Sequence, residues 1–155
     1  MPAVRRLLPL LLPALLALAA CSEVRDGPGM VSQRIGEVVR DPGAREVDLA
    51  KLTTFGWQYF VYFPAGTPRE ELCEFINAVR KGCGRIIRYA AVPQGHLVLL
   101  FGQNGQLTHA ELHAVANGEF DFATGRAGLP RERAVFRIHR TAVGVGNDRA
   151  VLELK

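Results

Sequence analysis

The segment Trp57 to Phe63 has the sequence WQYFVYF and consists almost entirely of aromatic and β-branched residues. Such residues favour β-strands, and Pro64 directly after them ends the strand. Side chains alternate between the two faces of a strand. One face therefore carries Trp57, Tyr59, Val61 and Phe63, and the other carries Gln58, Phe60 and Tyr62. A strand that is apolar on both faces needs cover on both sides, which predicts a central position in a sheet.

The segment after this strand predicts the main helix, from Pro68 to Lys81. Thr67 is expected to cap it, with Pro68 at the first helical position and Glu70 three residues after the cap. The apolar residues that follow are spaced i, i+3, i+4 and i+7, which places them on one face of a helix. They are Leu72, Phe75, Ile76 and Val79. Gly82 and Gly84 are expected to end the helix.

The rest of the chain predicts further strands. They are Glu46 to Leu52, Arg85 to Val92, His96 to Phe101, Gln106 to Ala114, Ala134 to Val143 and Ala150 to Leu154. Asn104-Gly105 predicts a tight hairpin turn. Residues 106–116 also fit a short helix, because Thr108 and Glu111 match a capping box. We expect the strand, since the turn needs a partner strand.

The expected order is therefore ββαβββββ, without an internal repeat. It predicts a single domain of the α+β class, a mostly antiparallel sheet with one main helix packed on one face. Within the segment Ala134 to Val143, apolar and polar residues alternate. The inward positions are Ala134, Phe136 and Ile138, and the positions facing water are Arg137, His139 and Thr141.

The first residues have the pattern of a secretory signal. Arg5 and Arg6 precede an apolar run from Leu7 to Ala20, and small residues lead into Cys21. The run has 14 residues and two prolines, whereas a membrane-spanning helix needs about 20 apolar residues.

The residues Leu18-Ala19-Ala20-Cys21 resemble the lipobox of bacterial lipoproteins. The resemblance implies that the Cys21 thiol carries a diacylglycerol, that the chain is cut before it and that the new amino terminus is acylated. Ser22, rather than aspartate, implies sorting to the outer membrane, facing the periplasm, rather than to the inner membrane. An ordinary cleaved signal is the alternative.

Removal of residues 1–20 leaves 135 residues, enough for one domain and a tether. Residues 21–45 are rich in glycine, proline and charge, which predicts a flexible tether, although Val31 to Arg40 could form a short helix or an added strand. The globular domain is expected over residues 46–155. The mature chain carries 17 basic and 15 acidic side chains, a net charge of +2, so nucleic acid is not expected as a partner. Its basic residues are scattered, and the nearest approach to a cluster is expected to be a solvated strand face rather than a site for an anionic ligand or a lipid headgroup; it consists of Arg126, Arg131, Arg133, Arg137 and Arg140.

Cys73 and Cys83 are the remaining cysteines of the three. An oxidising compartment favours a disulfide. A complete helix opposes it, because eight residues after Cys73 rise about 12 Å along the axis, whereas disulfide-bonded Cα atoms lie within about 7 Å. Either the helix ends early, near Ala78, or both thiols are free, and free thiols are slightly favoured.

The four histidines are His96, His109, His113 and His139. His109 and His113 are expected to share a face, with Glu111 excluded from it if the segment is a strand, and His96 could approach His109 across the hairpin. A zinc site needs three or four ligands. His96, His109 and His113 are weak candidates, and we expect surface histidines, no metal and no cofactor.

No motif for nucleophilic catalysis or phosphate binding is present. Both serines, Ser22 and Ser32, lie in the expected tether, where nothing rigid would hold a base beside them. The aromatic strand, Pro64 and the capped helix resemble small envelope lipoproteins of uncharacterised function. The first hypothesis is a membrane-anchored, non-enzymatic protein-binding module, an assembly accessory or an inhibitor or immunity protein. Phe60 and Tyr62 could contact its partner if the chain itself leaves them uncovered. The alternative is a small cell-wall hydrolase or metal-binding enzyme that uses His96, His109 and His113.

Overall fold

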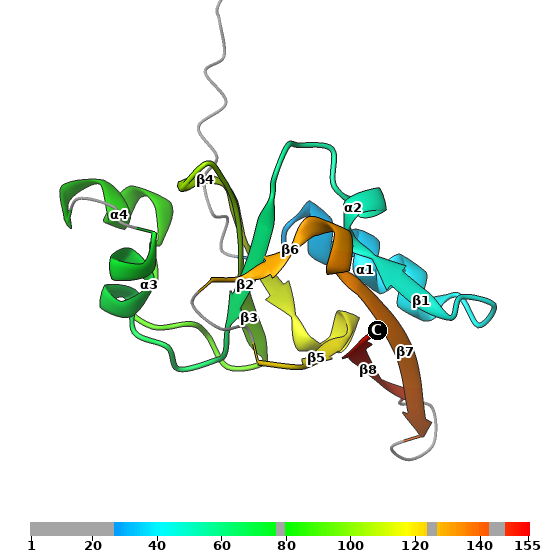
Figure 1. The fold of residues 1–155 in the computed structure, drawn as a ribbon. Coiled ribbons are helices and arrows are strands. Elements are labelled where there is room, and N and C mark those ends of the chain that lie inside the picture. The colour runs from blue at the N-terminus through cyan, green and yellow to red at the C-terminus, as the bar shows by residue number, and fades with distance from the viewer. Residues whose placement is uncertain (1–26, 77–79, 124–126, 143–147) are drawn as a thin grey trace, which may run out of the picture.

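The computed structural model describes residues 27–76, 80–123, 127–142 and 148–155. The signal segment and Cys21 lie outside the described residues. The fold belongs to the α+β class, as the sequence predicts, with helices and two separate sheets in one domain (Figure 1).

The first sheet contains the aromatic strand. Its order is β4-β3-β2-β6, and all its pairings are antiparallel. The strands are β2 (Tyr59–Phe63), β3 (His96–Gln103), β4 (Gln106–Ala114) and β6 (Leu129–Pro130). β2 lies between β3 and β6, which confirms its internal position. Asn104 and Gly105 form the predicted turn between β3 and β4, with φ values of +52° and +73°, and residues 106–114 are a strand rather than a helix.

The second sheet was not expected. Its order is β1-β7-β8-β5, and β5 runs parallel to β8. The strands are β1 (Glu46–Asp48), β5 (Glu119–Asp121), β7 (Val135–Ala142) and β8 (Asp148–Leu154). The predicted single sheet is therefore wrong. A second sheet packs against the Phe60 face of the first and provides the cover that one helix could not.

The core lies in two layers on either side of the first sheet. Between the sheets, Phe60 and Phe101 pack against Phe136 and Leu152 of the second sheet. On the opposite face, Val61 and Leu100 pack with Leu72, Cys83 and Ile87. The side chains of β2 thus alternate between the two layers, and Ala134, Phe136 and Ile138 point inward as predicted.

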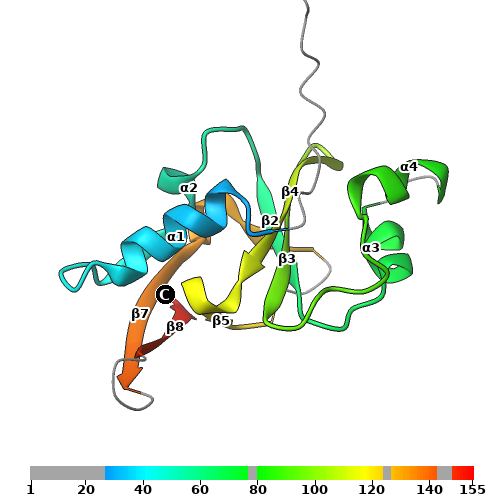
Figure 2. The same cartoon turned by 180° about the vertical axis from the view of Figure 1, so that it is seen from behind.

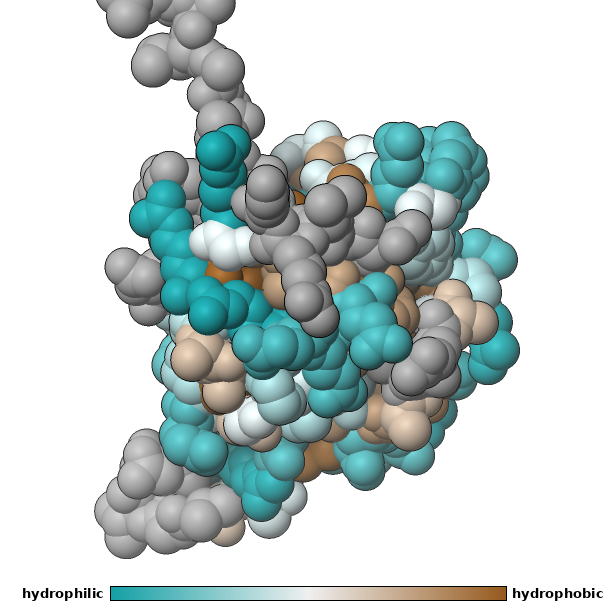
Figure 3. All heavy atoms as spheres, turned by 90° about the vertical axis from the view of Figure 1, so that its left-hand side faces the viewer, coloured by the Kyte–Doolittle hydropathy of each residue, from teal (hydrophilic) through white to brown (hydrophobic). Residues whose placement is uncertain are grey.

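The expected main helix is divided into two short helices, which cover the Val61 face of the first sheet (Figures 1 and 2). They are α3 (Arg69–Phe75) and α4 (Arg80–Ile86). The predicted helix from Pro68 to Lys81 and the predicted strand from Arg85 to Val92 are both wrong in extent. Pro68 is the N-cap of α3, and the Thr67 hydroxyl donates to the Pro64 carbonyl instead of capping. Figure 3 views this side, where the described atoms are mostly hydrophilic with apolar atoms between them.

The early end of α3 permits a disulfide between Cys73 and Cys83, whose Cα atoms lie 5.6 Å apart. The alternative of free thiols is therefore wrong. The bond joins α3 to α4, and Cys83 is buried against the first sheet. The early end of the helix is the alternative under which the sequence permits this bond.

The expected tether contains a helix that belongs to the core, α1 (Met30–Arg40). Val31 and Ile35 are completely buried, in the same cluster as Phe60 and Phe136. The domain therefore begins well before Glu46, with Pro28 already bridged to Leu112. The predicted strand from Glu46 to Leu52 stops at Asp48, because the Asp48 carboxylate accepts from the Ala50 N–H (3.1 Å) and caps α2 (Leu49–Leu52).

Short 3₁₀ turns complete the described fold. They are η1 (Val115–Asn117), after β4, and η2 (Arg131–Arg133), after β6.

Candidate functional site

The face of β4 that points toward α1 carries His109, Glu111 and His113. Residues two apart lie on the same face of a strand, so the expectation that Glu111 leaves this face is wrong. Glu111 and His113 are buried, and His109 is partly buried.

Glu111 bonds His109 on its own strand. The His109 Nε2 lies 2.7 Å from the Glu111 Oε2, and the imidazole ring stacks on Phe55 with ring centres 4.4 Å apart. Phe55 and Glu111 thus hold the ring in one orientation. His96 does not join this pair. It lies opposite Ala114, whereas His109 lies opposite Phe101 at the other end of the strand pair.

The Glu111 carboxylate also caps α1. Its Oε1 accepts from the Ser32 N–H at 2.7 Å, and its Oε2 accepts from the Val31 N–H at 3.2 Å. The first N–H groups of a helix have no partner inside the helix, and the N-cap residue Gly29 has no side chain to bond them. A Cβ on Gly29 would overlap with this carboxylate. The negative charge also suits the positive end of the helix dipole.

Ser32 completes the attachment of α1 to β4. Its Oγ accepts from the Ala114 N–H and from the Asn117 Nδ2, both at 3.1 Å, and the residue is fully buried. The expectation of a serine in a loose tether is therefore wrong. A buried hydroxyl held by two donors is a structural group, because a substrate cannot reach it.

The other end of α1 is held by Arg140. Its guanidinium donates to the carbonyls of Val39 (3.0 Å), Asp41 (2.7 Å) and Ala44 (3.0 Å). Cations are favourable at this end of a helix. The expectation that Arg140 lies on a solvated face is therefore wrong, because its guanidinium binds the end of α1. Glu111 of the first sheet therefore holds the N-terminal end of α1, and Arg140 of the second sheet holds its C-terminal end.

His113 is fully buried between β4 and β5. Its Nε2 donates to the Gly118 carbonyl at 2.6 Å, and its ring lies 5.4 Å from that of Phe120. Within the described residues, no group bonds its Nδ1. Burial lowers the pKa of His113 below its ordinary value of 6.5; the Gly118 bond and Glu111 oppose this shift, and His96 adds to it. His113 is therefore neutral and internal, contrary to the expected surface position.

The histidines do not converge on a metal. His139 lies on the outer face of the second sheet, 2.5 Å from the Glu153 carboxylate, as expected for a surface residue. Across the described ranges, no group of three or more His, Cys, Asp and Glu side chains is placed to hold a metal ion.

Phe60 and Tyr62 do not form an exposed patch. Phe60 is 0% exposed, and the Tyr62 hydroxyl donates to the Phe122 carbonyl. Both rings lie in one aromatic cluster with Phe101, Phe120, Phe122 and Phe136. The idea that Phe60 contacts a partner is wrong, because the chain itself covers it, whereas Tyr62 is half-buried and its contact with a partner stays a prediction.

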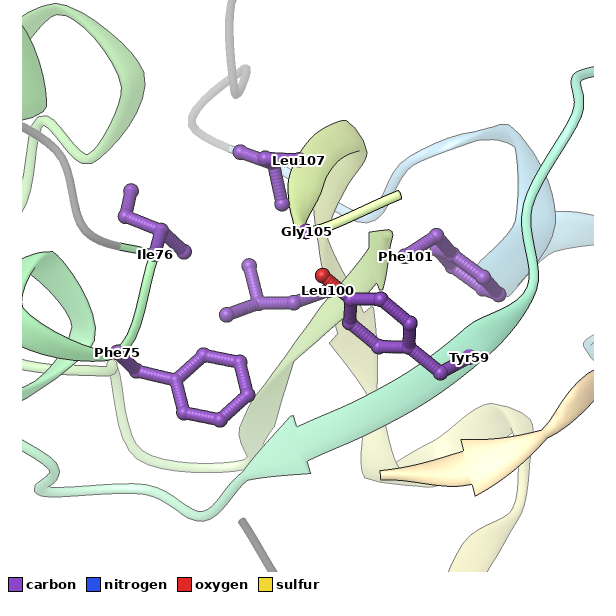
Figure 4. Close-up of a pocket in the computed structure, with 7 residues that line it drawn as sticks. All are labelled: Tyr59, Phe75, Ile76, Leu100, Phe101, Gly105 and Leu107. Atoms are coloured by element: carbon purple, nitrogen blue, oxygen red, sulfur yellow. The ribbon is translucent and has the colours of Figure 1, made fainter. Parts of the chain in front are cut away.

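A shallow groove lies on the other side of β2, between the end of α3 and the β3–β4 turn (Figure 4). Its lining is mostly apolar and half-buried, and the Tyr59 ring supplies one hydroxyl over Gly102. The lining residues are Tyr59, Phe75, Ile76, Leu100, Phe101, Gly105 and Leu107. The space is about 260 Å³ including its open mouth, which is below the range of pockets that enclose small-molecule ligands, about 300–1,000 Å³.

The groove was missed at the level of sequence. Phe75 and Ile76 were assigned to the buried stripe of a continuous helix, and only the end of α3 leaves them partly exposed. No helix in the described part of the chain is long and apolar enough to cross a membrane.

Comparisons with known proteins add no assignment: no family model matches the chain, and neither a curated protein nor a solved structure shows significant similarity to it.

Proposed function

We propose that the chain is a lipoprotein of the bacterial envelope, anchored in the membrane through Cys21, and that its domain is a non-enzymatic protein-binding module. The motif Leu18-Ala19-Ala20-Cys21 carries the anchoring proposal. Ser22 favours the outer membrane, with the domain facing the periplasm. An assembly accessory and an inhibitor or immunity protein both fit such a module.

The arrangement of polar groups supports binding rather than catalysis. Glu111, Ser32 and Arg140 are occupied with holding α1, and His113 is buried. A cell-wall hydrolase or metal enzyme built on His96, His109 and His113 is less well supported, because the strand register places His96 and His109 at opposite ends of the β3–β4 pair.

The groove supports a site for a protein partner. Its half-buried apolar walls could receive one or two side chains of a protein, the kind of anchor that dominates many interfaces. The Tyr59 hydroxyl offers one polar contact at its rim. Because the groove is small, an extended loop or a helix end of the partner fits it better than a free small molecule.

The anchor is tested by metabolic labelling with a palmitate analogue. We expect the full chain to be labelled and to fractionate with the envelope, and Cys21→Ser to lose both. Continued labelling of Cys21→Ser would contradict the lipoprotein proposal.

The binding module is tested by affinity capture of the lipidated protein from envelope extract, with Leu107→Asp as the groove variant. Val151→Asp is the matched control, since Val151 is also half-buried but lies on the second sheet. We expect one stoichiometric partner that Leu107→Asp loses and Val151→Asp keeps, with both variants folded by circular dichroism. Equal retention would exclude the groove, and absence of any partner would contradict the module.

A further inference from the structure

The start of the described chain is fixed to β4. Pro28 forms a parallel bridge with Leu112, and the Gly29 N–H donates to the Leu112 carbonyl at 2.9 Å. Glu111 and Ser32 fasten the first turn of α1 immediately afterwards. The domain therefore begins at Pro28 as a firmly held structure.

Only six residues lie between Cys21 and Pro28. The seven Cα-to-Cα steps from Cys21 to Pro28 span at most about 25 Å when fully extended, and less in any other conformation. A lipidated Cys21 lies at the bilayer surface. The end of the domain that contains Pro28 would consequently stay within this distance of the membrane, whatever path the connecting residues take.

The surface beside Pro28 carries an unusual side chain. Met30 is the first residue of α1 and is 43% exposed. Among the described residues, no other large hydrophobic side chain is exposed. The first turn of α1 contains no acidic residue, and the next exposed position of the helix, Gln33, is uncharged. Among the described residues, the acid nearest to this turn, Glu111, is buried beneath it. No exposed carboxylate in this turn would repel a negatively charged headgroup.

We propose that the start of α1 rests on the phospholipid surface, with Met30 inserted between the headgroups. This inference rests on the proposed lipid anchor. One apolar side chain binds a bilayer weakly by itself, but a short tether raises its effective concentration at the surface and makes a weak contact sufficient. Such docking would orient the domain, with the opposite end of α1 directed away from the membrane.

The experiment uses the lipidated full-length protein in phospholipid vesicles. A fluorescent probe is attached to Met30→Cys, and to Thr141→Cys as the control. Thr141 is exposed and follows Arg140, which binds the far end of α1; that end lies about 16 Å along the axis from Met30. The acylated Cys21 and the disulfide leave the introduced thiol as the one that reacts.

We expect vesicles to protect the probe at position 30 from aqueous iodide, and lipids with brominated acyl chains to quench it. The probe at position 141 should show full iodide quenching and no quenching by these lipids. Equal iodide quenching at both positions, in protein that is acylated and floats with the vesicles, would overturn the docking and leave the anchor intact. Protein that is not acylated would overturn both.

Discussion

At the start of α1, backbone N–H groups that have no partner within the helix meet the Glu111 carboxylate of β4. The contact joins residues about 80 positions apart in the chain. It is buried, so removal of the carboxylate leaves these N–H groups without an acceptor from the protein. The same carboxylate bonds His109, and one side chain therefore fixes both a helix start and a neighbouring ring.

Replacement of Glu111 should destabilise the domain. Glu111→Ala leaves two buried N–H groups without an acceptor, which costs about 2–4 kcal/mol. Glu111→Gln keeps one acceptor oxygen and should lose less. The free energy of unfolding from urea denaturation measures both, with exposed Glu132→Ala expected within about 0.5 kcal/mol of the wild type. Equal stability of Glu111→Ala and Glu132→Ala would contradict the capping role.

His113 should make stability depend on pH. Because its pKa is lowered in the folded state, the unfolded chain takes up a proton below pH 6.5 while the folded chain does not. The free energy of unfolding therefore falls as the pH drops from about 6.5 toward the lowered pKa, by at most about 1.4 kcal/mol per pH unit. The unpartnered Nδ1 is the atom that would have to accept this proton.

Urea denaturation between pH 7.5 and 5 checks this dependence. We expect His113→Gln to reduce the slope, and His139→Gln, on the outer face of the second sheet, to change it little. An unchanged slope in His113→Gln would assign the dependence to other groups.

At the scale of elements, the region after β2 could not form both a continuous helix and the Cys73–Cys83 disulfide. The apolar stripe favours one long helix, and the disulfide requires the chain to fold back after α3. The structure has the disulfide, with two short helices in place of one. Short helices are marginal alone, so packing on the first sheet and the Cys73–Cys83 bond together hold α3 and α4.

Removal of the disulfide should loosen these helices. The bond closes a loop with a sequence separation of 10, for which the chain-entropy relation gives about 2–3 kcal/mol. We expect Cys73→Ala with Cys83→Ala to lower the free energy of unfolding by this amount, and a reductant to lower it equally in the wild type while leaving the double variant unchanged. Two reactive thiols in the unreduced native protein would contradict the bond.

At the scale of the whole molecule, Phe60 lies where the two sheets meet. It contacts the rings of Phe101 on its own sheet and of Phe120 and Phe136 on the second, with centres 5.3 to 6.5 Å apart. Both apolar faces of β2 are therefore covered, one by α3 and α4 and the other by the second sheet (Figure 2).

Phe60→Ala should therefore affect folding rather than partner binding. Loss of a fully buried phenylalanine costs about 3–5 kcal/mol. Phe63→Ala, at a half-buried position on the other face, should cost less, and thermal and urea unfolding compare the two. A stable Phe60→Ala variant that fails only to bind a partner would contradict this assignment.

The sequence alone determined the features that depend on local chemistry. The internal position of β2, the Asn104-Gly105 hairpin, the inward face of β7 and the α+β class all follow from periodicity and turn residues. The lipidation motif is likewise a local pattern, and anchoring through Cys21 stays a prediction.

Only the tertiary structure decided which long-range contacts prevail. α1 joins the core although its segment has the composition of a tether: its apolar face packs into the cluster that contains Phe60, and Glu111 and Arg140 bind its two ends from other elements. The division between α3 and α4 depends on a bond between two side chains, and the burial of Phe60 depends on a second sheet made of segments distant in the chain. The groove exists only where these elements meet. No local pattern encodes such contacts, because each depends on residues that the folded chain alone brings together.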